Sequence, residues 1–325
     1  MKIPICIPDF TYFDSPEFLT LSLHIVSIIS TPIYCLGIYC ILFKTPKQMK
    51  SVKWYLLVVH FWIILFDYSI TILTVPYLLL PTIGGIPYGS FRTLGVPIEA
   101  QVLVVLAILC FIFVGILTIY ENRFFILCEF KWREKWEIWR RNWILLHYVV
   151  VLTLFIPLYF LIPDQDQAVQ EAFLKLPCYP AHIYNAPIFI LATNYVYHVA
   201  AATTLFTECV SEISFYITKL IKNGRKERKW VSKKTFKMHK QFILALIIQL
   251  TVPFVMLAIP TVCVFGSILV NYNVSFVVIV GTTHGLVSTV VMIVVHRPYR
   301  LAVIRMIRRK ENKKVKVSVL QILNS

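Results

Sequence analysis

Long apolar runs alternate along the chain with short segments rich in lysine and arginine. A helix needs roughly 20 apolar residues to cross a bilayer core of about 30 Å. Seven runs meet that length and predict membrane-spanning helices. Their approximate bounds are Leu19–Phe43, Tyr55–Leu80, Ile98–Tyr120, Trp143–Ile162, Pro187–Phe206, Phe242–Val264 and Phe276–Val295. The pattern therefore predicts an all-α membrane protein built as a seven-helix bundle.

The basic segments predict the orientation of these helices. All lysines and arginines except Lys2, Arg92 and Lys175 fall in four clusters, Lys44–Lys53, Arg123–Arg141, Lys219–Lys240 and Arg297–Lys316. Loops rich in lysine and arginine remain cytoplasmic, and seven crossings place all four clusters on that side. We therefore expect an extracellular N-terminal segment (1–18), a bundle (19–295) and a cytoplasmic tail (296–325).

Composition supports a membrane protein and argues against a nucleic-acid partner. Hydrophobic residues make up 58% of the 325 residues, and the mean hydropathy is +0.74. The net charge of +16 comes from short loops between spans, where topology and anionic inner-leaflet lipid account for it.

Two cytoplasmic segments are predicted to form amphipathic helices. Trp132, Trp136, Trp139 and Trp143 recur at helical spacing, with basic residues off their stripe. Because indoles are favoured in the headgroup region, we interpret this stripe as a membrane anchor, with a partner-binding face as the alternative. Arg300–Lys310 shows the same pattern and predicts a short helix along the inner leaflet.

One carboxylate lies near the middle of a predicted span. Asp67 is in the second span, and His60 precedes it by two turns on the same helical face. An intramembrane ionisable residue is a functional hypothesis by default. Three interpretations stay open: cation binding, a change of protonation, and hydrogen bonding to neighbouring helices.

Polar residues in the outer half of the predicted bundle are candidates for a small-molecule pocket. Such a pocket needs a few polar groups among apolar walls. The alternative for each residue is a hydrogen bond between helices. The candidates are Gln101, Asn194, Tyr197, His198, Thr283 and His284.

Glu121-Asn122-Arg123 lies where the third span meets the cytoplasm. The acid and the base cannot both face lipid, because a desolvated charge costs several kcal/mol. One of them is expected to point into the bundle. The alternative is that Arg123 extends to the lipid headgroups.

Two features are expected on the extracellular side. Cys6 and Cys178 are the cysteines that fall clearly in that oxidising environment, and we predict a disulfide between them. The sequon Asn273-Val274-Ser275 predicts glycosylation of Asn273.

Catalytic motifs are absent from the sequence. It contains no Gly-rich phosphate loop, no nucleophile elbow and no histidine pair at metal-ligand spacing. We therefore expect no enzyme activity, no cofactor and no metal.

Several short motifs together resemble the nematode serpentine chemoreceptors of class H (Srh), within the Str superfamily of seven-transmembrane G-protein-coupled receptors. The similarity extends from about Ser15 to Arg309. It is carried by Lys44-Thr45-Pro46-Lys47-Gln48-Met49, His60-Phe61-Trp62 with Asp67, Pro76-Tyr77, the stretch from Gly84 to Gly89, Glu121-Asn122-Arg123-Phe124 and His296-Arg297-Pro298-Tyr299-Arg300.

The resemblance implies a chemoreceptor in the plasma membrane of sensory cilia. It would detect a small environmental or pheromone-like molecule and signal through a heterotrimeric G protein. Arg123 matches the arginine that ends the third span in such receptors, and Pro298-Tyr299 takes the place of their Asn-Pro-x-x-Tyr ending. Two departures are the Asn122 between acid and arginine and the absent Asn-Pro-x-x-Tyr spacing. Neither the ligand nor the oligomeric state follows from the resemblance.

Two other classes of function remain as alternatives. A seven-helix ligand-gated channel with an internal N-terminus would place the basic clusters outside, against the charge rule. A proton-coupled transporter would use an intramembrane pair such as Asp67 and His60, but the internal repeats typical of transporters are absent from the sequence.

Overall fold

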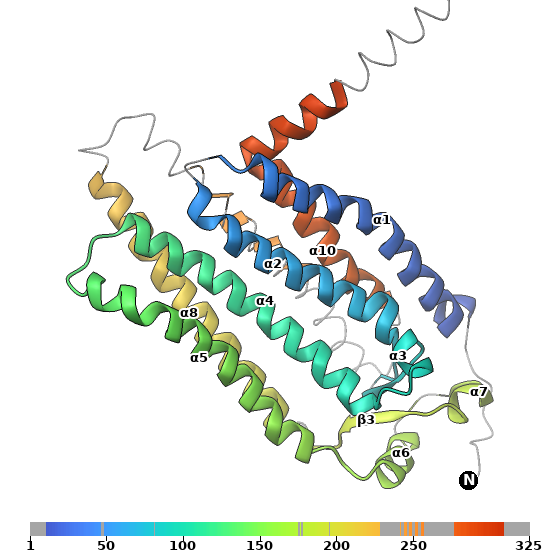
Figure 1. Cartoon of the computed structure of the whole chain (residues 1–325). Coiled ribbons are helices and arrows are strands. Elements are labelled where there is room, and N and C mark those ends of the chain that lie inside the picture. The colour runs from blue at the N-terminus through green and yellow to red at the C-terminus, as the bar shows by residue number, and fades with distance from the viewer. Residues whose placement is uncertain are drawn as a thin grey trace, which may run out of the picture.

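The computed structural model describes residues 11–46, 49–80, 82–174, 176, 178–194, 196–227 and 276–308, with short pieces between 241 and 256. Six long helices run along one another (Figure 1). They are α1 (Pro16–Lys44), α2 (Lys50–Tyr68), α4 (Ile98–Leu127), α5 (Arg133–Phe160), α8 (Val196–Glu227) and α10 (Phe276–Val295). The predicted sixth span, about Phe242–Val264, falls almost wholly outside the described residues.

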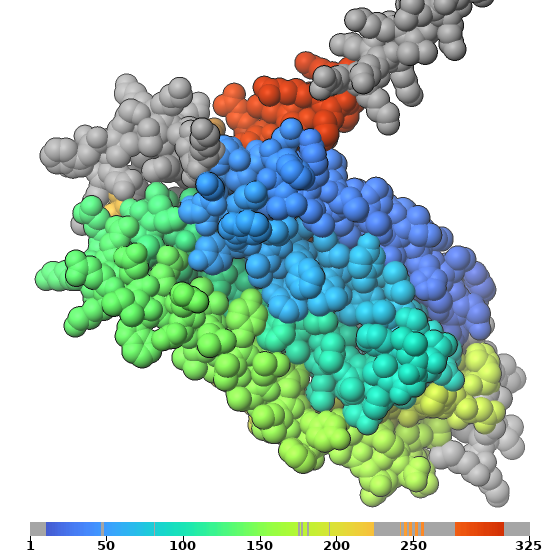
Figure 2. Space-filling view, in the orientation of Figure 1, coloured from blue at the N-terminus to red at the C-terminus, as the bar shows by residue number. Residues whose placement is uncertain are grey.

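Five of the described long helices, all except α8, have the length and composition of membrane spans. α1, α4, α5, α10 and the segment Lys50–Thr74 are each long and apolar enough to cross a bilayer. α4 packs against α2, α5 and α8, while α1 packs against α2 and α10. Large apolar side chains such as Ile28, Phe61 and Leu152 remain exposed on α1, α2 and α5, three helices prominent on the face in Figure 2. Such exposure is expected where lipid covers the helices.

The bounds of α1 follow from local sequence signals. Ser15 caps the helix, because its side-chain oxygen accepts a hydrogen bond from the Phe18 backbone N–H at 3.1 Å. Pro16 occupies the first turn, where its missing N–H costs nothing. The helix ends at Lys44, just before Thr45-Pro46, because the residue before a proline disfavours helical backbone.

Glycines allow α1, α2 and α10 to approach closely. A Cβ added at Gly37 would lie 2.7 Å from His60 Nε2, and one added at Gly285 would collide with the Asp67 carboxylate. Small residues have this role in membrane helix packing. The close approach brings the polar side chains of three helices together near Asp67.

The predicted helical bundle is confirmed, and a small antiparallel sheet that the sequence did not predict lies at one end of it. The sheet consists of β1 (Pro76–Leu78), β2 (Ile83–Pro87) and β3 (Phe189–Ala192), in that order. The predicted second span continued to Leu80, but α2 gives way to a π-helical segment, η3 (Ser69–Thr74), and then to β1. The π-helical segment ends at Thr74, because the next residue, Val75, has a left-handed backbone with a φ of 44°.

The start of the predicted fifth span was also wrong. Residues 189–192 form β3, and α8 begins only at Val196 and continues to Glu227. Hydrophobic periodicity cannot distinguish a short buried strand from a helical segment. The apolar run Phe189–Ala192 is such a case.

The sheet lies among short elements that close this end of the bundle. These are η1 (Tyr12–Asp14), α3 (Ser90–Thr93), α6 (Gln165–Phe173) and α7 (Ala181–Tyr184), of which α3, α6 and α7 are labelled beside β3 in Figure 1. The Gln165 side chain donates to the Ile190 carbonyl at 3.1 Å and accepts from the Ile190 N–H at 2.9 Å. It thereby pairs backbone groups of the edge strand β3. Tyr77 donates to the Asp14 carbonyl at 2.8 Å and ties the sheet to the chain before α1.

The opposite end of the bundle carries the basic segments. The ends of α1, α4, α8 and α10 and the starts of α2 and α5 all lie there (Figure 1). The described parts of the four basic clusters are therefore on one side, as an alternating series of crossings requires. A helix over residues 297–308 leaves α10 at an angle, so the helix predicted in Arg300–Lys310 is confirmed over its described part.

Candidate functional site

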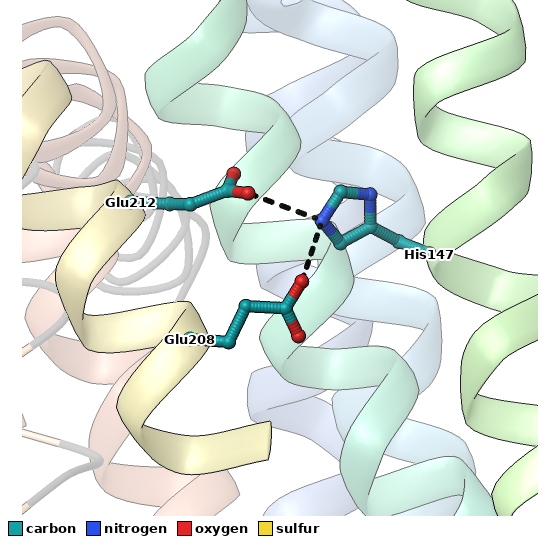
Figure 3. A group of neighbouring side chains, drawn as sticks. All are labelled: His147, Glu208 and Glu212. Carbon is teal, nitrogen blue, oxygen red and sulfur yellow. Dashed lines mark ion pairs between the residues drawn. The ribbon is translucent and has the colours of Figure 1, made fainter. Parts of the chain in front are cut away.

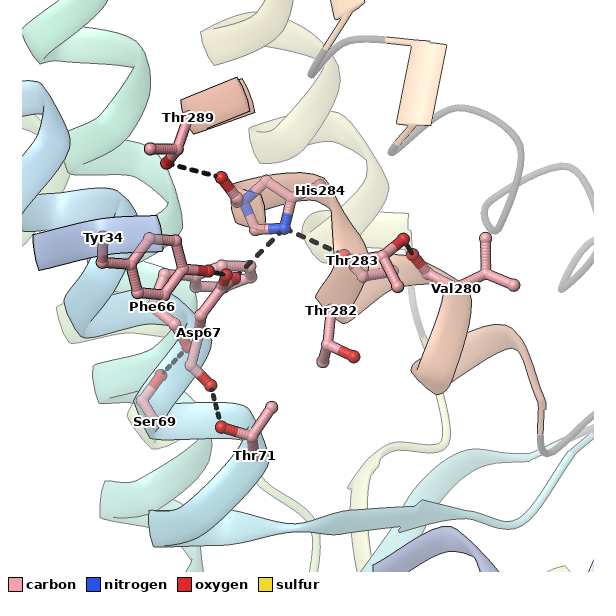
Figure 4. Close-up of polar contacts among 12 residues, drawn as sticks. Tyr34, Phe66, Asp67, Ser69, Thr71, Val280, Thr282, Thr283, His284 and Thr289 are labelled. Carbon is pink, nitrogen blue, oxygen red and sulfur yellow. Dashed lines mark hydrogen bonds and ion pairs between the residues drawn. The ribbon is translucent and has the colours of Figure 1, made fainter. Parts of the chain in front are cut away.

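Asp67 lies at a contact between three helices (Figure 4). Its side chain is buried, with a residue exposure of 3%. The Tyr34 hydroxyl of α1 donates a hydrogen bond to Asp67 Oδ2, and His284 Nδ1 of α10 lies 3.3 Å from Asp67 Oδ1. One carboxyl group of α2 thus connects the packing of α1, α2 and α10.

The hydrogen bonds of His284 leave part of this site under-satisfied. His284 Nδ1 lies 2.9 Å from the Gly281 carbonyl oxygen, which can only accept, so Nδ1 carries the hydrogen. Within the described part of the chain, Asp67 Oδ1 and His284 Nε2 are buried without a hydrogen-bond partner. Nearby hydroxyls, including those of Thr71 and Thr289, donate to carbonyls of their own helices. The site therefore has capacity for a proton or a small polar species.

His60 does not contact Asp67 as the sequence pattern suggested. It is buried, and its Nε2 lies 3.2 Å from the Tyr34 carbonyl oxygen. The two residues therefore contact opposite ends of Tyr34. Sequence reasoning did not identify Tyr34, although a tyrosine with Ser30 one turn earlier in an apolar run was an available signal.

A second polar cluster lies at the basic end of α4. Glu121, Asn122 and Arg123 are all buried, at 0%, 3% and 5% exposure. The prediction that one charge points into the bundle is confirmed, and in fact both do. Glu121 Oε2 is 2.7 Å from Arg140 Nη2, and the same nitrogen donates to Asn122 Oδ1 at 3.1 Å.

The tryptophan stripe contributes to this cluster, so two of its four side chains contact protein, while a membrane anchor stays a prediction for the exposed ones. Trp136 Nε1 donates to Glu121 Oε1 at 2.8 Å, and Trp143 packs on Tyr216 of α8 with ring centroids 6.3 Å apart. Trp132 and Trp139 remain 49% and 62% exposed. Helical spacing identifies side chains that share a face, but it does not show whether that face meets lipid or protein.

Arg123 faces the segment after α10 rather than Glu121. Burial and the nearby Arg123 guanidinium lower the pKa of His296 to about 4, so this imidazole is neutral at physiological pH. Tyr299 is fully buried close to Arg123, and its hydroxyl is 2.8 Å from Thr45 Oγ1 at the end of α1. Pro298 is half-buried beside it. The predicted switch residues thus join the ends of α1, α4 and α10.

The six candidate pocket residues are not brought into one contact network. Gln101 is buried and donates to the Val96 carbonyl at 2.8 Å, and exposed Asn194 accepts from the Val196 N–H at the start of α8. Tyr197 and His198 are half-buried neighbours. Thr283 donates to its own helix, and His284 belongs to the Asp67 site.

The extracellular predictions are tested only in part. Cys178 is bonded in a disulfide, but Cys6 lies outside the described residues, so their pairing stays a prediction. Cys35, Cys40, Cys110 and Cys209 are free cysteines in the described part of the chain. Asn273 also lies outside the described residues.

Comparison with known proteins agrees with the resemblance seen in the sequence. A family model described as serpentine type 7TM GPCR chemoreceptor Srh matches residues 14–309. The serpentine receptor class H-72 of Caenorhabditis elegans is 25% identical over 305 residues, covering 91% of this chain and 87% of that relative. The matched residues include those of the predicted sixth span, most of which the structure does not describe.

Replacing Asp67 should weaken the contact between α1, α2 and α10. Asp67→Ala removes the acceptor for Tyr34 and leaves its buried hydroxyl unsatisfied, at a cost of about 1–3 kcal/mol. Asp67→Asn retains an acceptor oxygen, so we expect it to lower the free energy of unfolding by less than half as much as Asp67→Ala. Thermal unfolding of purified protein, followed by thiol-reactive fluorescence, measures the difference. Equal stability of Asp67→Ala and wild type would contradict the structural role.

Replacing Arg140 should destabilise the protein because Glu121 would remain buried without its cation. Removing one partner of a buried ion pair costs about 3–5 kcal/mol. The double variant Glu121→Gln/Arg140→Met is expected to recover most of the loss, since no uncompensated charge remains. Comparing the unfolding temperatures of the single and double variants tests this coupling. If the effects of the two substitutions on stability simply added, the coupling would be refuted.

Proposed function

The chain belongs to the serpentine seven-transmembrane chemoreceptor family of class H, and we propose that it detects a small molecule and signals through a heterotrimeric G protein. The ligand class is a small environmental or pheromone-like molecule. The observation that carries the proposal is the buried cluster at the basic end of α4, where Arg123 faces Tyr299 while Glu121 pairs with Arg140.

The cluster suggests how signalling would occur. Arg123 and Tyr299 lie where α1, α4 and the helix over residues 297–308 meet. Separation of these elements would uncover a buried cation at the face that carries the basic segments. A ligand shifts such an equilibrium only by its differential affinity for the two arrangements. The ligand would bind in the half of the bundle nearer the sheet, where Gln101, Asn194, Tyr197, His198, Thr283 and His284 are the proposed contacts.

The Asp67 site is proposed as the connection between these two regions. It joins α1, α2 and α10, and α10 leads directly into His296 and Tyr299. Movement of α10 relative to α1 and α2 would change the distance between Asp67 and His284. We therefore propose hydrogen bonding between helices for Asp67 in the observed arrangement, with proton or cation binding as the change on activation.

The orientation and location belong to the same proposal. The chain is a multi-pass membrane protein, and the basic segments gathered at one end support an extracellular N-terminus and a cytoplasmic tail. The proposed location is the plasma membrane of sensory cilia. The structure weakens the transporter alternative, because His60 contacts Tyr34 and not Asp67.

Arg123→Ala should abolish signalling while surface expression is retained. The substitution removes the cation proposed to reach the G protein once the cluster opens. Calcium responses of cells expressing the receptor with a promiscuous Gα, tested with a panel of volatile and amphiphilic compounds, provide the measurement. Arg141→Ala, at an exposed arginine on α5, is the matched control and should respond like wild type. An unchanged response of Arg123→Ala would contradict the switch.

Epitope accessibility on intact cells tests the proposed orientation. An N-terminal tag should bind antibody without permeabilisation, and a C-terminal tag should bind only after permeabilisation. The physical reason is retention of the basic loops in the cytoplasm. The reverse pattern would favour the channel alternative with an internal N-terminus.

A further inference from the structure

A group of ionisable side chains between α5 and α8 has no part in the proposed signalling mechanism. His147 projects from α5 toward Glu208 and Glu212 of α8 (Figure 3). The two glutamates are four residues apart, so they occupy the same face of their helix. Both carboxylates approach the same nitrogen of the imidazole, His147 Nε2.

Both distances exceed those of direct hydrogen bonds and are close to the separations between ligand atoms around a metal ion. Nε2 lies 3.7 Å from Glu208 Oε1 and 3.6 Å from Glu212 Oε1, beyond the usual N–H···O range of about 2.7–3.2 Å. All three ligand atoms lie within 4.8 Å of one another. Atoms bound tetrahedrally to zinc at about 2.0–2.2 Å are separated by about 3.3–3.6 Å. A small inward adjustment would complete the coordination.

The hydrogen bond at the other ring nitrogen orients the imidazole for metal binding. His147 Nδ1 lies 2.9 Å from the Trp143 carbonyl oxygen, which can only accept, so Nδ1 carries the hydrogen. In the neutral ring, the lone pair on Nε2 then points at the carboxylates. A backbone carbonyl that fixes the tautomer in this way is typical of metal-binding histidines. The Trp143 ring, 4.4 Å from the imidazole centroid, packs against the same side chain.

The local charge favours a cation at this place. Two carboxylates beside one imidazole carry a net charge of −2 when the ring is neutral, and Nε2 is buried with no hydrogen-bond partner in the described part of the chain. The His147 side chain is 12% exposed, Glu212 29% and Glu208 45%. Two carboxylates close together repel each other unless a counter-charge joins them.

We propose that His147, Glu208 and Glu212 form a Zn²⁺ site that ties α5 to α8. One nitrogen and two carboxylate oxygens suit zinc, which binds both types of donor and leaves a fourth position for water. Mg²⁺ and Ca²⁺ prefer oxygen donors alone. The site differs in place and residues from the proposed ligand and G-protein contacts, so it does not depend on the proposed function. Bound zinc would stabilise the contact between α5 and α8 by an amount that rises with the free zinc concentration relative to its dissociation constant.

Zinc titration of the purified full-length chain tests the proposal. Metal-free protein in nanodiscs is titrated with ZnCl₂ while binding heat and thermal unfolding are recorded. We expect one Zn²⁺ per chain and a higher unfolding temperature. Glu208→Gln/Glu212→Gln, which keeps the side-chain shapes, and His147→Ala are each expected to weaken binding by about 10-fold or more. Unchanged zinc affinity in these variants would overturn the proposal.

Two further measurements distinguish the proposed zinc site from zinc binding at a neighbouring thiol and from protonation of His147. Cys209 follows Glu208 directly and has a free thiol, so Cys209→Ser is the matched control and should bind zinc like wild type; loss of binding there would assign the metal to the thiol and overturn the site. Co²⁺ added to wild-type protein should produce the strong visible absorption of a four-coordinate ion without any substitution. Neither a cobalt band nor a zinc-dependent shift in wild type would mean that a proton on Nε2 serves as the counter-charge, and the proposal would fail.

Discussion

An ionisable side chain inside a helix bundle needs a polar partner, and this requirement accounts for much of the arrangement between the helices. Asp67 meets Tyr34 and His284, Glu121 meets Arg140 and Trp136, and the pair Glu208 and Glu212 meets His147. In each case the partner comes from a different helix. Apolar packing between helices provides little orientation in lipid, because the surrounding tails are equally apolar. The polar contacts therefore specify which helix faces align.

These contacts lie at places that matter for a receptor with two arrangements. The Asp67 site connects α1, α2 and α10, and the cluster around Glu121 and Arg123 connects α4 to α5 and to the chain after α10. The group around His147 adds a connection between α5 and α8. A movement that weakens one of these contacts must expose charge or bring in a new partner, such as water, a proton, a metal ion or a G protein. The energetic cost of separating such groups would make the rearrangement proposed above switch-like.

Predictions from the sequence were most accurate where composition alone was sufficient to make them. The apolar runs placed the described helices, and the spacing of basic residues predicted which loops share an end. They were less accurate where two structures fit one pattern: residues 189–192 form a strand rather than the start of a helix, and Trp136 faces Glu121 rather than lipid. They also missed Glu208 and Glu212, because the predicted fifth span ended at Phe206 and the partner of these acids lies about sixty positions away in another helix.

The sequence by itself determined that the chain crosses a membrane repeatedly, and it identified the family through short motifs at characteristic depths. Hydrophobic length and charge placement take effect through the bilayer, because each segment interacts with lipid and water independently of the other segments. Only the tertiary structure decided the partners of the buried charges, such as His284 rather than His60 for Asp67 and Arg140 rather than Arg123 for Glu121. Those choices depend on the rotation and close approach of whole helices, which glycines such as Gly285 permit and which no local pattern encodes.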